Sequence, residues 1–271
     1  MQLGVNVPNF GPGTDPGILR QWARLAEGLG VGTLMVSDHV AVTPDVAARY
    51  PEPFYEPFTT LAWLAGLTTT VRLGTTVLVL PYRHPLLVAR MAANLHDLSD
   101  GRFVLGVGVG WARQEFEALG VPYTARGRLT DECLAILREA RDARRGEGDL
   151  PVWVGGHSEA ALRRAVRFGD AWHPLRLPVP RMREILRRHA LPGFAPRIAL
   201  RVTGSPVDAP DRPAGVGTVE QIVGDLRQLR RLGADTVVLD PYHGDPEETR
   251  RPDAAWQALT TVATHWKDTA S

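Results

Sequence analysis

Residues 103–116 read Phe103-Val-Leu-Gly-Val-Gly-Val-Gly-Trp111-Ala-Arg-Gln-Glu115-Phe116, and this stretch decides how the rest of the chain is interpreted. Apolar residues alternate with Gly106, Gly108 and Gly110, which is typical of a buried strand with one bare side. Glycines stand in this way where a ligand or another part of the backbone comes close. The stretch therefore predicts a buried strand that stops at a strand-to-helix corner.

A second corner of the same design lies further along the chain. Pro151-Val-Trp-Val-Gly155-Gly156-His-Ser158 begins as an apolar strand and leads into a helical pattern over residues 159–168. Two glycine corners on neighbouring strands indicate one shared ligand.

Strand and helix patterns alternate along the whole chain. Strands are predicted near residues 3–7, 32–37, 73–80, 103–109, 151–155, 169–173, 197–202 and 235–240, and helices near 15–29, 57–70, 85–99, 112–145, 158–168, 179–190, 218–231 and 252–266. Eight apolar strands, each followed by a helix, favour a parallel sheet closed into a barrel. The prediction is an α/β fold, a (β/α)8 TIM barrel forming a single domain over residues 1–271. A doubly wound open sheet is the alternative.

Composition narrows the possible partners. The 271 residues carry 31 basic and 30 acidic side chains, a net charge of +1, so nothing attracts the chain generally to nucleic acid or to membranes. A single cysteine, the lack of a signal-peptide pattern and the lack of a long apolar run predict a cytoplasmic protein. No spacing of ligand residues indicates a metal site.

Active sites of such barrels collect at the C-terminal ends of the strands, so the polar residues there are the candidates. They include Asp38, His39, Thr75, Thr76, Trp111, Glu115, Ser158, His173, Arg176, Asp240, Tyr242 and His243. If a helix begins at Trp111, then Trp111 and Glu115 share one face of it. His173 and Arg176 continue toward the rim and are candidates for contact with substrate or cofactor.

Four motifs, taken in order, carry a resemblance. They are Ser37-Asp38-His39, Leu73-Gly-Thr75-Thr76-Val, Asp100-Gly-Arg102 continuing through Gly110-Trp111 to Glu115-Phe116, and Pro151 to Ser158 followed by Ala165-x-x-x-Gly169-Asp170-Ala-Trp172. The chain resembles the bacterial luciferase-like monooxygenase superfamily over nearly its whole length. It is most similar to the branch that uses the deazaflavin coenzyme F420, and the branch that uses FMN stays open.

The resemblance implies where a cofactor would bind. Its phosphate would lie at the second glycine corner, where free N–H groups at a helix start bind anions. Its ring would lie against a bulge with a non-proline cis peptide at Gly74-Thr75 or Thr75-Thr76. The implied cofactor-binding residues are Asp38, His39, Gly74, Thr75, Thr76, Gly108, Gly110, Trp111, Gly155, Gly156, His157 and Ser158.

The resemblance also implies catalytic residues. His39 would lie beside the reactive carbon of the ring, where an imidazole can give or accept a proton as hydride moves. Asp38 would help to hold the pocket. Some relatives use a glutamate near the fourth-strand corner as an acid; this chain has Gly110-Trp111 there and offers only Glu115 one turn later. That departure argues against a glutamate-assisted mechanism.

A second departure concerns the substrate cover. Relatives carry an extended insertion before the fifth strand, whereas here residues 138–150 lead almost directly to Pro151. A shortened insertion leaves the mouth more open, which suits a bulky substrate, and shelters a flavin peroxide less well. The proline- and aromatic-rich segment 41–57 is then the expected cover.

Three function classes follow. The first is an F420-dependent oxidoreductase, with F420H2 delivering hydride to a small organic or natural-product substrate, or the reverse reaction oxidising an alcohol. The second is an FMNH2-dependent two-component monooxygenase, and the third is a noncatalytic flavin-binding barrel. The family also implies a homodimer; the apolar residues for such an interface are Leu61, Trp63, Leu64, Leu67, Leu86, Leu87 and Met91.

Overall fold

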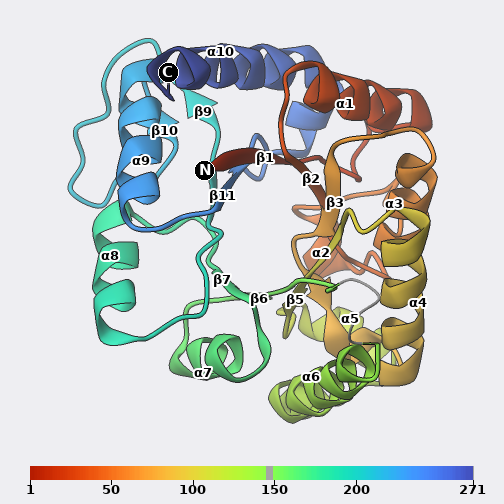
Figure 1. The fold of residues 1–271 in the computed structure, drawn as a ribbon. Coiled ribbons are helices and arrows are strands. Elements are labelled where there is room, and N and C mark those ends of the chain that lie inside the picture. The colour runs from red at the N-terminus through yellow and green to blue at the C-terminus, as the bar shows by residue number, and fades with distance from the viewer. Residues whose placement is uncertain (145–148, 271) are drawn as a thin grey trace.

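The structure is a computed structural model that describes residues 1–144 and 149–270. Its centre is a barrel of parallel strands wrapped by helices (Figure 1). The barrel strands are β1 (Gln2–Asn6), β2 (Thr33–Val36), β3 (Arg72–Thr75), β5 (Phe103–Gly108), β6 (Val152–Gly155), β7 (Ala171–His173), β8 (Arg197–Ala199) and β11 (Thr236–Asp240).

The strands follow the order β7-β6-β5-β3-β2-β1-β11-β8, and every pair in it is parallel. Two isolated parallel bridges, Trp172 to Phe194 and Leu175 to Arg197, join the two ends of this sheet. The barrel is therefore nearly closed. The predicted (β/α)8 fold is confirmed over the open-sheet alternative.

Helices fill the connections between the strands. The long ones are α1 (Pro16–Gly28), α3 (Pro57–Ala65), α4 (Pro85–Leu98), α6 (Arg126–Asp142), α7 (Glu159–Phe168), α8 (Val179–Arg188), α9 (Val219–Arg231) and α10 (Pro252–Ala270). The start signals in the sequence work as expected: Asp15 accepts from the N–H of Ile18 at 2.8 Å, and Thr218 forms a capping box with Gln221. Among the described helices, none combines the length and apolar character needed to cross a bilayer.

Short elements lie in the loops. They are α2 (Pro44–Ala47), α5 (Arg113–Ala118), η1 (Leu80–Tyr82), η2 (Tyr123–Ala125), η3 (Pro246–Arg250) and the strands β4 (Leu78–Val79), β9 (Arg201–Val202) and β10 (Val216–Gly217). The predicted helix over 112–145 is thus divided into α5, η2 and α6. α6 ends at Asp142 and β6 begins at Val152, so the connection is short, as expected; residues 145–148 within it lie outside the described residues.

The predicted strand over 73–80 is interrupted by a bulge. β3 pairs Gly74 with Val104 and β4 pairs Leu78 with Val107, so three residues, 75–77, stand opposite two, 105 and 106. The non-proline cis peptide joins Thr76 and Val77, and the two positions expected from the resemblance were therefore wrong. The reason is the register: the extra residue falls after Thr75, where β3 has already ended.

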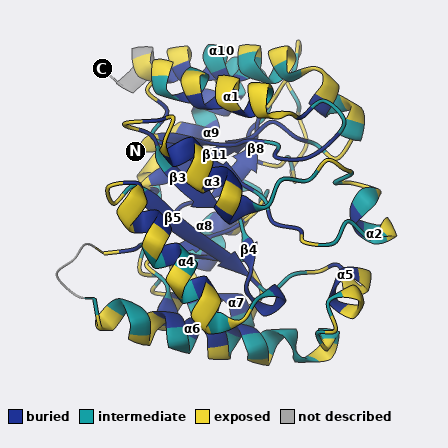
Figure 2. Cartoon of the chain, turned by 90° about the vertical axis from the view of Figure 1, so that its right-hand side faces the viewer, coloured by how far each residue is buried: buried dark blue, intermediate teal, exposed yellow. Residues whose placement is uncertain are grey.

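The barrel interior is packed with side chains. Met35, Val104, Trp153, Ala171 and Val238 form an interior cluster with Ala195, while the alternate residues of the same strands pack outward against the helices. The helices bury one face and expose the other (Figure 2). Because the interior is filled, a ligand has room only at a mouth of the barrel.

Candidate active site

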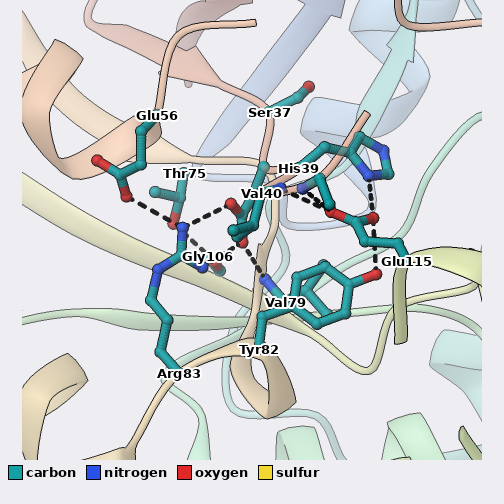
Figure 3. A network of polar contacts seen from close by, with 12 residues as sticks. Ser37, His39, Val40, Glu56, Thr75, Val79, Tyr82, Arg83, Gly106 and Glu115 are labelled. Carbon is teal, nitrogen blue, oxygen red and sulfur yellow. Dashed lines mark hydrogen bonds and ion pairs between the residues drawn. The ribbon is translucent and has the colours of Figure 1, made fainter. Parts of the chain in front are cut away.

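His39 and Glu115 form a buried pair at the C-terminal mouth of the barrel. His39 follows β2, and Glu115 lies in the first turn of α5, which follows β5. Nδ1 of His39 lies 2.6 Å from Oε2 of Glu115 (Figure 3). Glu115 is completely buried and His39 is 7% exposed. The structure thus brings together two of the three predicted catalytic residues.

Glu115 receives further hydrogen bonds. Its Oε1 accepts from the backbone N–H groups of Val40 at 2.6 Å and Ala41 at 3.1 Å, and its Oε2 accepts from the hydroxyl of Tyr82 at 2.9 Å. Burial alone raises the pKa of Glu115, but the contact with His39 and these hydrogen bonds hold it below its ordinary value. Burial and the nearby carboxylate raise the pKa of Tyr82, which therefore stays a phenol and donates.

This arrangement fixes the imidazole. An ionised carboxylate only accepts, so Nδ1 of His39 carries the proton that faces Glu115. Nε2 has no hydrogen-bond partner within residues 1–144 and 149–270. Nε2 is therefore the nitrogen that can exchange a proton with a bound molecule.

Asp38 points elsewhere. Its two oxygens accept from Nη1 and Nη2 of Arg83, both at 2.8 Å, and one also accepts from the N–H of Val79. Arg83 reaches on to Glu56 at 3.0 Å (Figure 3). Asp38 thus joins the β2 corner to β4 and, through Arg83, to the start of α3. That it helps to hold a cofactor pocket stays a prediction.

Aromatic rings cover His39. Tyr50 stacks on the imidazole with ring centroids 5.3 Å apart, and Phe54 and Trp111 present edges at 5.4 and 5.7 Å. Tyr50 and Phe54 belong to segment 41–57, the predicted cover. α5 begins at Arg113, so the expectation that Trp111 and Glu115 share a helix face was wrong: Trp111 precedes the helix and meets the site through His39. Trp111 is 46% exposed.

The glycines of β5 serve the protein's own packing. A Cβ on Gly106 would lie 2.0 Å from the carbonyl oxygen of Thr75, and one on Gly108 would lie 2.5 Å from Val77. These glycines make room for the bulge after β3, so the bare side of the strand faces another part of the backbone rather than a ligand. A Cβ on Gly74 would likewise meet Met35, and one on Gly110 would meet Val79 and Phe116.

The second glycine corner is open. Gly156 has φ +101°, and the side chains of His157 and Ser158 are exposed. Oγ of Ser158 accepts from the N–H of Ala161 at 3.2 Å and caps α7, while its own hydroxyl hydrogen remains free to donate. An added Cβ on Gly156 would meet only Ala161, whereas one on Gly155 would lie 2.9 Å from the side chain of Val77. The indole of Trp172 donates to the carbonyl of Gly156 at 2.7 Å, so the backbone N–H groups are what this corner offers to a ligand.

A second polar network was only partly visible in the sequence. Arg197 of β8 donates to Asp240 of β11 and to the carbonyl and hydroxyl of Thr76, and the Thr76 hydroxyl in turn meets Nε2 of His173 at 2.8 Å. Burial lowers the pKa of His173 to about 4, so this histidine is neutral and structural. Arg197 was missed; its signal is a charged residue at the start of a strand pattern, before Ile198 and Ala199.

No cluster of metal ligands is present in the part of the chain that the structure describes. Parallel (β/α)8 barrels whose polar side chains gather at the carboxyl ends of the strands form a large class of enzymes, and this chain has that form. Within that class the chain belongs to the luciferase-like monooxygenase family, because residues 1–191 match the model of that family.

Solved proteins of similar fold differ in the cofactor that their names give. An uncharacterised protein of Mycobacterium tuberculosis is 34% identical over 180 residues, 55% of this chain and 62% of that protein, so the chain spans less than two thirds of this relative. The F420-dependent tetrahydromethanopterin reductase of Methanopyrus kandleri superposes with a TM-score of 0.70 at 15% identity, covering 98% of this chain and 99% of the other. The oxygenating constituent of 3,6-diketocamphane monooxygenase of Pseudomonas putida, in complex with FMN, gives 0.73 at 14%, covering 97% of each.

Proposed function

We propose that this chain is an F420-dependent oxidoreductase that works as an F420H2-dependent reductase and transfers hydride to a small organic or natural-product substrate. The observation that carries the proposal is the buried His39–Glu115 pair at the barrel mouth. A histidine held in one tautomer, with Nε2 free, is suited to donate the proton that accompanies hydride transfer. Storage of a ring would not require such a pair.

The open corner at Gly155–Ser158 is the place for the cofactor phosphate. Its glycines add no side chain, and the first N–H groups of α7 are the donors that an anion uses. The ring of the cofactor would lie against the bulge at Thr75 and Thr76. His39 and Trp111 would contact it from the other strand ends of the mouth. A bound deazaflavin supplies the two-electron hydride chemistry. The protein's own part is to bind, to exclude water with Tyr50, Phe54 and Trp111, and to hold the proton of His39.

An FMNH2-dependent monooxygenase is the second candidate, and the FMN-bound neighbour favours it. F420 is preferred because the connection from β5 to α6, which leaves the strand at the mouth, holds only the short elements α5 and η2 and adds no large cover there. A flavin peroxide needs more shelter from water than a deazaflavin does.

Titration of the purified protein with F420 and with FMN tests the choice of cofactor. We expect F420 to bind at least about tenfold more tightly than FMN, a difference of about 1.4 kcal/mol. Fluorescence of each cofactor gives both dissociation constants. Tight binding of FMN with no binding of F420 would make the monooxygenase the better assignment.

A serine variant tests where the cofactor phosphate binds. Ser158→Ala removes both the cap and the free hydroxyl, so it should weaken cofactor binding about five- to tenfold and lower the stability by about 1 kcal/mol. Ser205→Ala, in the exposed loop after β9, is the matched control and should leave both values unchanged. Unchanged cofactor affinity in Ser158→Ala would move the phosphate site elsewhere.

We expect a homodimer that packs through α3 and α4, which lie side by side (Figure 1). Trp63, Leu67, Leu86 and Leu87 are exposed there, whereas Leu61 and Leu64 are buried and face their own barrel. Exposed apolar residues gathered on one face are typical of an interface.

A charged residue in this interface tests the dimer. Leu87→Glu should convert the dimer to a monomer in sedimentation velocity, and Val166→Glu, at an exposed position of α7, should not. A monomeric wild-type protein would contradict the expectation.

A further inference from the structure

Two consecutive residues, Tyr82 and Arg83, reach the two carboxylates beside His39 (Figure 3). The Tyr82 hydroxyl donates to Oε2 of Glu115 at 2.9 Å, and the guanidinium of the next residue donates to both oxygens of Asp38 at 2.8 Å. Tyr82 ends η1 and Arg83 follows it, so one short turn after β4 serves both acids. The acids come from different places, because Asp38 precedes His39 in the chain and Glu115 lies on α5.

The two acids differ in the charge of their partners. Asp38 faces a guanidinium, which is always positive and which it shares only with Glu56, a side chain that is 36% exposed to water. Glu115 accepts from a phenol and from two backbone N–H groups, and these three donors are neutral. No lysine or arginine among the described residues forms an ion pair with Glu115. Its negative charge is therefore left for the imidazole of His39.

The four hydrogen bonds to Glu115 are divided evenly between its oxygens. Oε1 accepts from the two N–H groups, and Oε2 accepts from Tyr82 and, at 2.6 Å, from Nδ1 of His39. A carboxylate has about four lone-pair sites, so the carboxylate of Glu115 is fully engaged. The Tyr82 ring is held as well, because it is 8% exposed and packs against Phe116 with ring centroids 4.8 Å apart. Tyr82 and His39 thus share one oxygen in a fixed geometry.

A shared oxygen makes the two contacts depend on each other. Burial raises the pKa of Glu115, and its hydrogen bonds, that of Tyr82 among them, lower it. Each such bond favours the charged carboxylate and makes it a weaker base. Without the phenol, Oε2 would accept from Nδ1 alone, and the stronger contact would stabilise a positively charged imidazole. An imidazolium stabilised in this way gives up the proton on Nε2 less readily.

We infer that Tyr82 is a positioning residue that sets, through Glu115, how readily His39 passes on the proton at Nε2. This inference rests on the proposed function, because it takes proton transfer by His39 to accompany hydride transfer. Tyr82 keeps its own proton throughout, since burial and the carboxylate of Glu115 raise its pKa. Its part is to hold the shared oxygen, and the proton moves at the opposite side of the imidazole.

Tyr82→Phe tests the inference by NMR of the cofactor-free protein, because it removes one hydroxyl and keeps the ring against Phe116. The proton on Nδ1 of His39 should stay there, and its signal should move downfield, since Oε2 then accepts from Nδ1 alone. Tyr123→Phe is the matched control. Tyr123 packs against the same Phe116 ring, with centroids 5.4 Å apart, and its hydroxyl has no hydrogen-bond partner among the described residues. The signal should stay in place in this control.

Reaction rates connect the shared oxygen to the chemistry. Single-turnover oxidation of bound F420H2 should slow about three- to tenfold in Tyr82→Phe, the scale of one net hydrogen bond, with the affinity for F420 nearly unchanged. Tyr82→Phe added to Glu115→Gln should change the rate less than about twofold, because residues in one network are not additive. A residue that only supports packing would instead slow both backgrounds equally.

The wild-type protein supplies a measurement for the case in which Tyr82→Phe fails to fold. The hydroxyl proton of Tyr82 and the Nδ1 proton of His39 point at the same oxygen, so each should give a nuclear Overhauser effect to the other. Absence of this effect, an Nδ1 signal that stays in place in folded Tyr82→Phe, a wild-type rate in that variant, or additive effects in the double variant would each overturn the inference. The NMR experiments use no cofactor. A failure of F420 binding would therefore remove the proposed function and leave the shared oxygen intact.

Discussion

Replacing His39 by alanine is expected to lower kcat by about 10²–10⁴-fold while the affinity for the cofactor changes less than about threefold. The reason is the position of Nε2, the one imidazole nitrogen that Glu115 does not engage. A general acid contributes only when a proton moves in the transition state, so its loss appears in kcat rather than in binding. Single-turnover oxidation of bound F420H2, with any acceptor that the wild-type protein reduces, measures the change.

Two comparisons make the His39 result specific. Added imidazole should restore part of the rate to His39→Ala, because a small base can enter the space that the side chain leaves. His265→Ala, an exposed histidine on α10, should keep the wild-type rate. A near-normal rate in His39→Ala with cofactor bound would remove the histidine from the chemistry, although the site could still bind the ring.

The barrel could be predicted because its signals are local. Each strand is an apolar run, and each helix start is marked by a residue such as Asp15 or Thr218 whose side chain caps the helix within three positions. The bulge after β3 was placed wrongly because residues 73–80 form one uninterrupted strand pattern. Which of them is the extra residue depends on the pairing with β5, and residues 73–80 by themselves do not reveal that register.

The site was predictable by position but not by partner. His39 and Glu115 were both candidates, yet their contact joins residues 76 apart and depends on α5 beginning at Arg113. The doubt about Glu115 assumed that an acid must stand at the corner itself; the first turn of α5 instead carries it back beneath the imidazole. Arg197 and Asp240 are 43 apart in the sequence, and nothing local connects them.

Glu115→Gln is the substitution that tests whether Glu115 acts through His39. The amide of glutamine would place a donor opposite Nδ1, so the imidazole would have to move its proton to Nε2. We expect kcat to fall about 10²–10³-fold with KM nearly unchanged, and the stability to fall by about 1–3 kcal/mol. Nitrogen NMR of His39 should show the proton on Nδ1 in the wild-type protein and on Nε2 in the variant, a change that a purely structural role would not produce.

The pH dependence of stability gives a second readout for Glu115. Its pKa in the folded protein is lowered, so its contribution is present above the ordinary glutamate pKa of about 4.3 and is lost as pH falls through the folded value. Below about pH 4.3 the unfolded chain takes up the proton first, and the wild-type protein should lose stability there. Glu115→Gln cannot titrate, so its curve should be flatter in this range.

Glu115→Ala should cost more, about 3–5 kcal/mol, because it also leaves the N–H groups of Val40 and Ala41 and the hydroxyl of Tyr82 without their acceptor. Glu117→Gln changes an exposed carboxylate on the same helix. It is the control for kcat, for the His39 tautomer and for the pH dependence of stability. If Glu115→Gln kept the wild-type kcat and the same His39 tautomer, the pair would be a packing feature of the β2 corner. If instead kcat falls in Glu115→Gln and is unchanged in Glu117→Gln, Glu115 acts by holding the proton on Nδ1 of His39. Nε2 is then left without a proton and free to exchange one with a bound molecule.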